Sequence, residues 1–366
     1  MKTPGIIAEQ VGLAPMTTMR LGGPARYLAR CTTADEIRTA LEWAAGQGLP
    51  VQVLGGGSNT LFDDRGYPGL VLKLELSGVR FEGGGGKVEV SALAGEDWDA
   101  LVRRCIARGL SGIECLSGIP GLVGAAPMQN VGAYGQEVAG TIAAVRAIDR
   151  ATLKEVDFAN RECGFRYRNS RFKSEDRDRY VVTEVVFRLE EGVRPELRYR
   201  ELSECVARRG GLDGLEPGEP ASSAVRAAVL DLRRSKSMVL DPGDPNTRSV
   251  GSFFLNPVLS EAELSALQRR CAPGPGEKQS PIPVFPDPAG HKVPAAWLVE
   301  RAGFRKGQRL GGAAVSEKHA LALVNRGGGS ADVLKLAGAI QQQVEERFGI
   351  RLEREPVVVS AEGAVQ

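Results

Sequence analysis

The sequence predicts a globular protein of mixed helices and strands with two or three domains, and three observations carry that prediction. The chain has 366 residues, which is more than one hydrophobic core usually serves. Its composition, with 42% hydrophobic and 25% charged residues, is that of an ordinary globular protein. Helix-like and strand-like patterns alternate in the first part, and strand-like stretches with polar connections dominate beyond residue 141.

Apolar residues at helical spacing predict four helices. The segments are 34–46, 96–109, 222–235 and 331–348. Gly109 and Gly349 are placed to end the second and the fourth of them, because glycine readily adopts the left-handed conformation that closes a helix.

Short apolar runs predict the strands that lie between these helices. They occur at 51–54, 70–76, 142–148, 180–189 and 356–360. Residues 240–248 and 272–291 are rich in Pro, Gly and Asp, and we expect loops or boundaries there.

Charge, cysteine and histidine content exclude several function classes. Forty-seven basic and 45 acidic residues leave a net charge of +2, so neither nucleic acid nor an anionic membrane is implied as a partner. The N-terminus lacks an apolar segment of signal-peptide length and no run approaches a membrane helix, which predicts a cytoplasmic protein. The six cysteines contain no C-x-x-C pair and are interpreted as reduced thiols. With His291 and His319 far apart, we expect no metal site and no Ser-His-Asp triad.

The most unusual segment is 117–135, which contains five glycines and two prolines but no side chain that is charged at neutral pH. Glycine and proline weaken or break helices, so this run is not an ordinary core helix. Its small side chains would let main-chain N–H groups and the amides of Gln129 and Asn130 face a large flat ligand, with Tyr134 at the rim. A buried Gly/Ala-rich turn without a ligand is the alternative.

A second glycine cluster, Gly-Gly-Gly-Ser-Asn at 55–59, follows the predicted strand at 51–54. Successive unobstructed N–H groups suit a phosphate or diphosphate, although a structural turn explains this motif equally well by itself. The chain has neither G-x-G-x-x-G opening a helix nor Gly-Lys-Ser/Thr, so the standard dinucleotide and P-loop motifs are absent from its sequence.

Taken together, these segments resemble the FAD-binding segments of the UDP-N-acetylenolpyruvoylglucosamine reductase family. Further stretches match that family in the same order: Phe-Arg-Tyr-Arg-Asn-Ser-Arg-Phe-Lys at 165–173, Gly-Ser-Phe-Phe-Leu-Asn-Pro at 251–257, Gly-Gly-Ala-Ala-Val at 311–315 and Leu-Glu-Arg-Glu at 352–355. The resemblance covers nearly the whole chain. It implies an α+β fold, in which two domains of the vanillyl-alcohol-oxidase type clasp FAD and a third α+β domain binds the substrate.

The resemblance also implies domain boundaries, cofactors and partners. A first FAD-binding domain would span 1–81 and be completed by 349–366, a second would span 82–236, and the substrate-binding domain would span 237–348. FAD would be the bound cofactor, and NADPH and UDP-N-acetylglucosamine-enolpyruvate would be the substrates of a monomeric cytoplasmic enzyme. Its product, UDP-N-acetylmuramate, is used in peptidoglycan synthesis.

The family's chemistry explains why three charged or polar residues would be needed. Hydride addition to the β-carbon of an enolpyruvyl ether leaves negative charge on the α-carbon and its carboxylate, and a fixed cation and strong donors must stabilise that charge. Arg168 matches the family's arginine for the carboxylate, Glu355 matches its glutamate, and Ser252 matches the proton donor to the α-carbon. Each also has a simpler explanation: a solvated surface charge for Arg168, an exposed strand-edge carboxylate for Glu355, and a turn or cap hydroxyl for Ser252.

The same matches assign cofactor and substrate contacts. The implied FAD contacts are Gly55, Gly56, Gly57, Ser58, Asn59, Ser117, Ile119, Pro120, Gly121, Gly124, Ala125, Gln129, Asn130, Gly132, Ala133 and Arg233. The implied substrate contacts are Tyr134, Tyr167, Tyr199, Lys236 and Asn256, with Lys236 and the tyrosine hydroxyls suited to the UDP phosphates. Tyr199 suggests the tyrosine-loop (type I-like) subgroup, which closes a loop over the substrate; a half-buried strand tyrosine is the alternative.

Departures from the family pattern leave some assignments open. Spacing from Leu352 favours Glu355 over Glu353 as the glutamate, but period-2 alternation would put both on one face of a strand. Gln308 and Arg309 compete for a position before the Gly-Gly-Ala-Ala-Val stretch. The rival functions are an FAD-dependent oxidase of the same fold and a non-catalytic nucleotide-binding scaffold.

Overall fold

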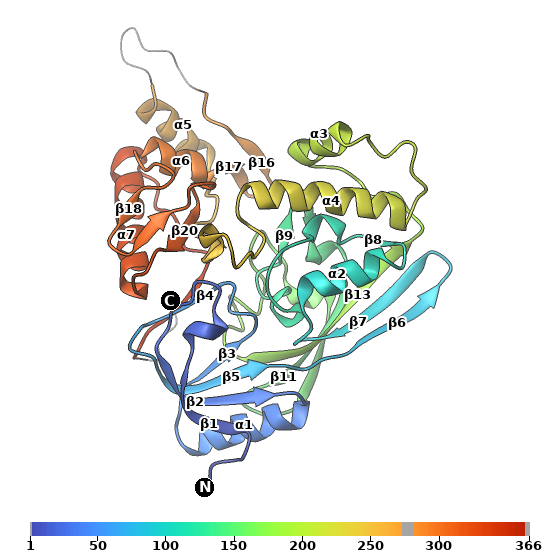
Figure 1. Cartoon of the computed structure of the whole chain (residues 1–366), viewed down its shortest axis with the longest axis vertical. Helices are drawn as coiled ribbons and strands as arrows, with labels where there is room; N and C mark the ends of the chain where they lie inside the picture. The colour runs from blue at the N-terminus through green and yellow to red at the C-terminus, as the bar shows by residue number, and fades with distance from the viewer. Residues whose placement is uncertain (1, 273–280, 363–366) are drawn as a thin grey trace. The chain divides into compact units, whose positions relative to one another are not determined.

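The structure is a computed structural model that describes residues 2–272 and 281–362 (Figure 1). The chain divides into two compact units. The first unit comprises Met1–Gly12, Pro24–Gly57 and Tyr67–Leu240, and the second comprises Leu13–Gly23, Ser58–Gly66 and Asp241–Gln366. Because these units group 13–23 and 58–66 with the C-terminal part, their boundaries differ from those of the three domains that the family resemblance implies.

Two β-sheets form the framework of the first unit. One has the order β1-β2-β5-β3, with β1 antiparallel to β2 and the other pairs parallel. The other has the order β12-β11-β13-β7-β6 with β8 paired to β13, and all its pairs are antiparallel. The strands of the two sheets are β1 (Ile7–Gly12), β2 (Pro24–Cys31), β3 (Val51–Leu54), β5 (Tyr67–Leu74), β6 (Val79–Gly84), β7 (Lys87–Leu93), β8 (Leu110–Ser111), β11 (Ile142–Asp149), β12 (Glu155–Ala159) and β13 (Tyr180–Glu191). A separate hairpin joins β9 (Gly132–Ala133) to β10 (Gln136–Glu137).

Four α-helices accompany these sheets: α1 (Ala34–Gly46), α2 (Trp98–Ile106), α3 (Arg200–Arg208) and α4 (Glu219–Ser235). Helix α1 begins at a capping box, in which the Thr33 hydroxyl accepts from the Glu36 N–H and the Glu36 carboxylate accepts from the Thr33 N–H. Asp97 caps α2 by accepting from the Ala100 N–H at 2.8 Å. These local signals explain why both helices begin close to where the sequence predicts them.

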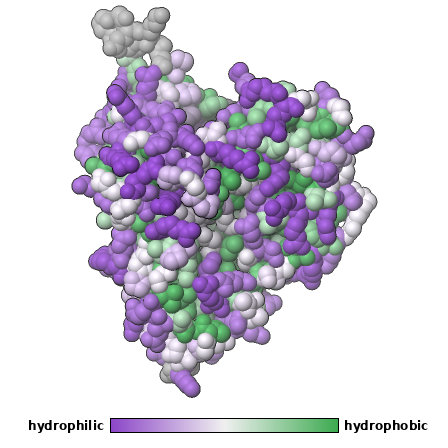
Figure 2. Space-filling view, in the orientation of Figure 1, coloured by the Kyte–Doolittle hydropathy of each residue, from purple (hydrophilic) through white to green (hydrophobic). Residues whose placement is uncertain are grey.

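Each sheet of the first unit has its own hydrophobic core. The buried face of α1 packs with Leu70, Leu72 and Leu74 of β5. The buried face of α2 packs with inward residues of β7, β11 and β13. Helices α3 and α4 lie side by side (Figure 1) and bury a smaller apolar cluster together with Cys115. Figure 2 shows hydrophilic residues over their outward faces.

The second unit contains α5 (Glu261–Arg270), α6 (Ala295–Arg301) and α7 (Ser330–Phe348) around one large hydrophobic core. Its main sheet has the order β14-β20-β19-β18 and a smaller one the order β15-β17-β16. The strands are β4 (Thr60–Phe62), β14 (Ser249–Ser252), β15 (Val258–Leu259), β16 (Phe285–Asp287), β17 (Gly290–Lys292), β18 (Arg309–Leu310), β19 (Ala313–Val315), β20 (Ala322–Asn325) and β21 (Val357–Val359). Strand β21 pairs in parallel with β4, so the C-terminal segment returns to the chain that follows the glycine cluster.

All four predicted helices and all five predicted strands are present; α1 and β3 have the predicted bounds, and the others have shifted ends. Helix α7 ends at Gly349, whose φ of +70° is the left-handed closing conformation that the sequence predicts. The prediction of a loop at 272–291 is partly wrong, because 285–287 and 290–292 pair as β16 and β17; residues 273–280 lie outside the described residues. Their Pro- and Gly-rich composition concealed strands only three residues long. Helices α3, α5 and α6 are additional to the prediction.

Membrane-spanning helices, metal-binding groups and cysteines can be examined in the part of the chain that the structure describes. No described helix is both long enough and apolar enough to cross a membrane. In the same part of the chain, no group of His, Cys, Asp and Glu side chains is arranged to hold a metal ion. The six cysteines are free, and burial raises the pKa of the Cys105 thiol to about 12.

Candidate functional site

The first unit brings its two glycine segments into direct contact. A Cβ added to Gly56 would lie 2.7 Å from Gly121 Cα, which is closer than real Cβ contacts allow. One added to Gly55 would lie 3.9 Å from Ala125 Cβ. Because Gly56 and Gly121 have no side chains, the backbones of the two segments can pack directly on each other.

Three backbone N–H groups at this junction remain available for a ligand. Among the described residues, the N–H groups of Gly56, Ile119 and Gly121 have no hydrogen-bond partner. Gly121 has a φ of +123°, a conformation that glycine adopts without strain. Backbone N–H groups without partners on small residues suit an anion such as a diphosphate. The junction therefore fits the FAD that the sequence resemblance implies.

Other N–H groups of the 117–135 run are used inside the protein. The Gly118 N–H donates to Asp99 Oδ1 at 2.6 Å, and the Gly124 N–H donates to the Ala94 carbonyl at 3.0 Å. A Cβ on Gly124 would lie 2.6 Å from Ala94 Cβ, so glycine is required there for packing. The ligand-facing surface that the sequence suggested for the whole run is thus limited to part of it.

Arg233 near the end of α4 supplies an unpartnered buried donor beside this run. Its Nη2 donates to the Met238 carbonyl at 2.7 Å, whereas its buried Nε has no partner among the described residues. A Cβ on Gly118 would lie 3.5 Å from that Nε. Burial lowers the pKa of Arg233, so this environment is costly for the cation unless an anion or another acceptor completes it. An FAD oxygen would supply such an acceptor.

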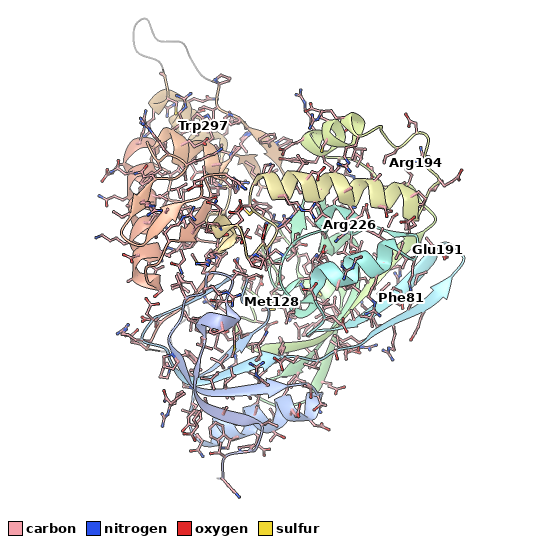
Figure 3. The ribbon with its side chains drawn as sticks, viewed as in Figure 1. Phe81, Met128, Glu191, Arg194, Arg226 and Trp297 are labelled. Carbon is pink, nitrogen blue, oxygen red and sulfur yellow. The ribbon has the colours of Figure 1, made fainter. Side chains whose placement is uncertain are left out.

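An ion pair fixes α4 against α2 and the glycine run. Arg226, labelled in Figure 3, forms a bidentate pair with Asp99, with N–O distances of 2.6 and 2.7 Å. Burial by itself would raise the pKa of Asp99, but the hydrogen bonds from Arg226 and Gly118 outweigh it and hold the pKa below its usual range. Asp99 therefore remains charged and connects three segments.

Arg168 lies in a strained turn directed at the same run. Its φ is +50°, which is unusual for a residue with a side chain. Its Nη2 donates to the Gly132 carbonyl at 2.6 Å, and its guanidinium carbon lies 5.4 Å from the centroid of the Tyr167 ring. These contacts orient the guanidinium and argue against a freely solvated surface charge.

Asn130 connects the Arg168 turn to the β9–β10 hairpin. It is 1% exposed, with a φ of +46°. Its Nδ2 donates to Glu137 Oε2 at 2.7 Å and to the Arg166 carbonyl at 3.1 Å, while its Oδ1 accepts from the Ala139 N–H at 3.0 Å. The amide that the sequence suggested for the ligand is thus used to position the turn that carries Arg168.

Tyr134 and Tyr199 pack edge to face, with ring centroids 5.6 Å apart. Burial raises the pKa of Tyr134 to about 12, so its hydroxyl stays protonated and can donate. Tyr199 is 44% exposed and immediately precedes α3, so it is not a strand residue. This placement leaves a large aromatic side chain near solvent at the end of a connecting segment.

Lys236, predicted to contact the substrate phosphates, pairs with a carboxylate in this structure. Its Nζ lies 2.8 and 2.9 Å from the two oxygens of Glu201 on α3. This ion pair joins the C-terminal end of α4 to the helix that follows Tyr199. A phosphate oxygen would compete with Glu201 for the same ammonium.

The second unit brings Ser252 and Glu355 onto adjacent backbone segments. The Glu355 N–H donates to the Phe253 carbonyl at 3.0 Å, and Phe254 and Arg354 form an antiparallel bridge. Ser252 ends β14, and its hydroxyl has no hydrogen-bond partner among the described residues. This hydroxyl therefore does not cap a helix or close a turn. Glu353 is exposed, whereas Glu355 is half-buried.

Asn59, the last residue of the Gly-Gly-Gly-Ser-Asn cluster, positions Glu355. Its Nδ2 donates to the Glu355 carbonyl at 3.3 Å, and its own carbonyl accepts from the Val357 N–H at 2.9 Å. Asn256 Oδ1 accepts from the Ala295 N–H at 2.9 Å, at the beginning of α6. Both asparagines thus organise the backbone of the second unit as well as being predicted ligand contacts.

The other predicted residues are placed as follows. Ser117, Pro120, Ala125, Gln129 and Ala133 lie along the run in the first unit; Gly57 ends a segment of that unit and Ser58 begins one of the second. Ser117 is buried and donates to the Glu114 carbonyl at 2.6 Å. Gln308 Oε1 accepts from the Arg305 N–H at 2.9 Å, whereas Arg309 is exposed on β18.

Sequence reasoning missed the charged residues that hold the glycine segments and α3 in place. Asp99 and Arg226 are 127 positions apart, and no spacing in the sequence connects them. Glu201 has no motif of its own, and its neighbouring arginines suggest only a solvated helix face. Their roles follow from contacts that the folded chain creates.

Comparison with known proteins identifies related sequences over the whole chain. Residues 244–359 match the family model described as UDP-N-acetylenolpyruvoylglucosamine reductase, C-terminal domain, and residues 25–152 match the FAD binding domain. The UDP-N-acetylenolpyruvoylglucosamine reductase of Thermobifida fusca is 46% identical over 358 residues, covering 96% of this chain and 98% of that protein. The protein of the same name from Mycobacterium tuberculosis is 44% identical over 365 residues, covering 96% and 95%.

A solved structure supports the same relationship. The crystal structure of UDP-N-acetylenolpyruvylglucosamine reductase from Thermus caldophilus aligns with a TM-score of 0.64 and 26% identity, covering 96% of this chain and 97% of that one. The predicted α+β fold, with a vanillyl-alcohol-oxidase-type FAD-binding part and a further C-terminal domain, is confirmed by these matches.

Proposed function

The chain belongs to the UDP-N-acetylenolpyruvoylglucosamine reductase family and is an FAD-dependent oxidoreductase. We propose the reaction that it catalyses and the residues that perform this reaction. It reduces the enolpyruvyl C=C bond of UDP-N-acetylglucosamine-enolpyruvate with electrons from NADPH, giving UDP-N-acetylmuramate for peptidoglycan synthesis. The observation that carries the proposal is the placement of the unpartnered Ser252 hydroxyl on the segment that pairs with Glu355.

FAD fits the residues at the glycine junction. The N–H groups of Gly56, Ile119 and Gly121 and the unpartnered Nε of Arg233 would hold it, because these are donors without protein acceptors. When bound, FAD supplies the hydride-transfer chemistry that no side chain can perform.

Three residues of the chain bind the substrate carboxylate, stabilise the developing negative charge and donate a proton. Arg168 holds the enolpyruvyl carboxylate with a guanidinium that Gly132 and Tyr167 already orient. Glu355, protonated or sharing a proton, stabilises the negative charge that develops at the α-carbon and carboxylate. The Ser252 hydroxyl then donates its proton to the α-carbon, and a strongly basic carbanionic centre makes that transfer feasible from a weak acid.

The remaining substrate contacts and the organisation of the enzyme are part of the same proposal. Lys236 binds a UDP phosphate, and Tyr199 closes over the substrate as in the tyrosine-loop (type I-like) subgroup. Tyr134, Tyr167 and Asn256 complete the substrate contacts. The enzyme acts as a cytoplasmic monomer, with FAD-binding domains at 1–81 plus 349–366 and at 82–236 and a substrate-binding domain at 237–348.

An anaerobic titration tests the proposed reaction. The purified protein should be yellow, NADPH should bleach it, and UDP-N-acetylglucosamine-enolpyruvate should restore the colour. Alternate use of one site by the two substrates predicts ping-pong kinetics. A colourless protein that cannot be reconstituted with FAD would refute the enzyme proposal. Rapid reoxidation in air without any response to the enolpyruvyl substrate would instead identify an oxidase.

A further inference from the structure

Lys73 is a half-buried cation at the glycine cluster that the proposed reaction leaves without a role. It lies on β5 beside Leu54, the last residue of β3, and its ammonium donates a hydrogen bond to the Gly55 carbonyl. Burial lowers the pKa of Lys73, so a charged amine is costly at this position.

The carboxylate that acts on the Lys73 charge is already paired with another cation. Arg30 lies opposite Lys73 on β2, and its guanidinium pairs with Glu75 on β5. Among the described residues, no carboxylate lies within ion-pair distance of the Lys73 ammonium. Glu75 is thus already paired with Arg30, and the hydrogen bond of the Lys73 ammonium goes to a neutral carbonyl.

The hydrogen bond from Lys73 also fixes the direction of a ligand-binding group. In a trans peptide, the carbonyl of one residue and the N–H of the next point to opposite sides of the chain. Holding the Gly55 carbonyl toward Lys73 therefore turns the Gly56 N–H away from Lys73. This N–H is one of those left without a partner, and a rotation of the flexible glycine peptide would misdirect it.

We propose that Lys73 is a positioning residue for FAD: its ammonium holds the Gly55–Gly56 peptide so that the Gly56 N–H faces the FAD diphosphate, and its positive charge favours that anion. The inference rests on the proposed FAD site and assigns a charged residue to a glycine motif that has none.

The test compares FAD binding by the full-length apoproteins of the wild type and three variants. Lys73→Met removes the charge and the hydrogen bond, and Lys73→Gln removes the charge while keeping a donor. Lys87→Met is the matched control, because Lys87 is an exposed lysine of the same unit. Fluorescence titration with FAD at several NaCl concentrations gives Kd and its salt dependence, and urea unfolding of each apoprotein gives its stability.

A lost charge-assisted hydrogen bond should raise the Kd for FAD by about ten- to a hundredfold in Lys73→Met. Lys73→Gln should recover part of this loss, and both variants should show a weaker salt dependence than the wild type. A Kd within about twofold of Lys87→Met, or an unchanged salt dependence in Lys73→Gln, would overturn the inference. If Lys73→Met does not fold, Lys73→Gln decides the question alone. A wild-type protein that takes up no FAD would refute the proposed function instead.

Discussion

Replacing Gly56 by alanine tests whether the contact between the two glycine segments is what forms the FAD site. The new Cβ would lie 2.7 Å from Gly121 Cα and 3.2 Å from Gly121 C, and both are backbone atoms that cannot rotate away. An ordinary carbon–carbon contact of about 3.5 to 4 Å requires the segments to separate by roughly 1 Å. Forced overpacking of this kind typically costs about 1–3 kcal/mol.

Separation of the two glycine segments in Gly56→Ala should weaken FAD binding in addition to lowering the free energy of unfolding. The unpartnered N–H groups of Gly56 and Gly121 belong to the two segments that must separate, so the distance between these two donors would change. We expect the Kd for FAD to rise at least about tenfold, equivalent to about 1.4 kcal/mol of binding free energy. Titration of the apoprotein with FAD and urea unfolding measure the two effects separately.

Gly84→Ala is the matched control, because a Cβ at Gly84 would meet nothing within 4 Å. That variant should bind FAD like the wild type, and its free energy of unfolding should change by less than about 1 kcal/mol. If Gly56→Ala bound FAD with wild-type affinity, the close approach of the segments would have no part in forming the site. If both variants lost affinity equally, the effect would not come from the contact with Gly121.

The remaining predictions concern the proposed catalytic residues and the Asp99 ion pair. In Ser252→Ala, stopped-flow measurements should show normal flavin reduction by NADPH but reoxidation by substrate slowed about 10²- to 10⁴-fold, whereas equal slowing of both half-reactions would indicate a structural role. Arg168→Lys should retain FAD but lose turnover, because an ammonium cannot reproduce the oriented guanidinium that donates to Gly132; wild-type kcat would remove Arg168 from the mechanism. Asp99 has a lowered folded-state pKa, so its pairing with Arg226 stabilises the protein above the unfolded pKa of about 3.9 and is lost as the pH falls through the folded value. The difference in unfolding free energy between wild type and Asp99→Asn should therefore shrink below about pH 4, and a difference independent of pH would contradict the ion-pair account.

Local sequence patterns predicted the elements that depend on neighbouring residues. Helix α1 matches its predicted range because a capping box and apolar spacing act within one segment, and α7 ends at the predicted glycine. Strands β16 and β17 were missed because each is only three residues long and is stabilised by pairing with the other. Their local composition favours turns, and tertiary pairing overrides it.

The predicted site shows the same division. Motif resemblance selected Arg168, Ser252 and Glu355. The structure adds how two of them are held, Arg168 through the Gly132 carbonyl and Glu355 through Phe253 and Asn59. The resemblance could not reveal that the Asn130 amide positions the Arg168 turn. Such a role depends on hydrogen bonds to residues that are distant in sequence.

The ordered motifs and the apolar periodicity of the chain predicted its fold class and its family, and they suggest the residue types of the proposed reaction, because these patterns can be recognised without the folded structure. The folded structure adds which of these groups are already hydrogen-bonded within the protein and which have no partner among the described residues. Asp99 takes the Gly118 N–H, whereas the N–H groups of Gly56 and Gly121 remain without partners among the described residues. Lys73 acquires its place at the Gly55 carbonyl because β3 and β5 pair in parallel. Whether an N–H group can bind a ligand depends on whether another group of the protein already accepts its hydrogen bond, and these hydrogen bonds form only when the chain folds.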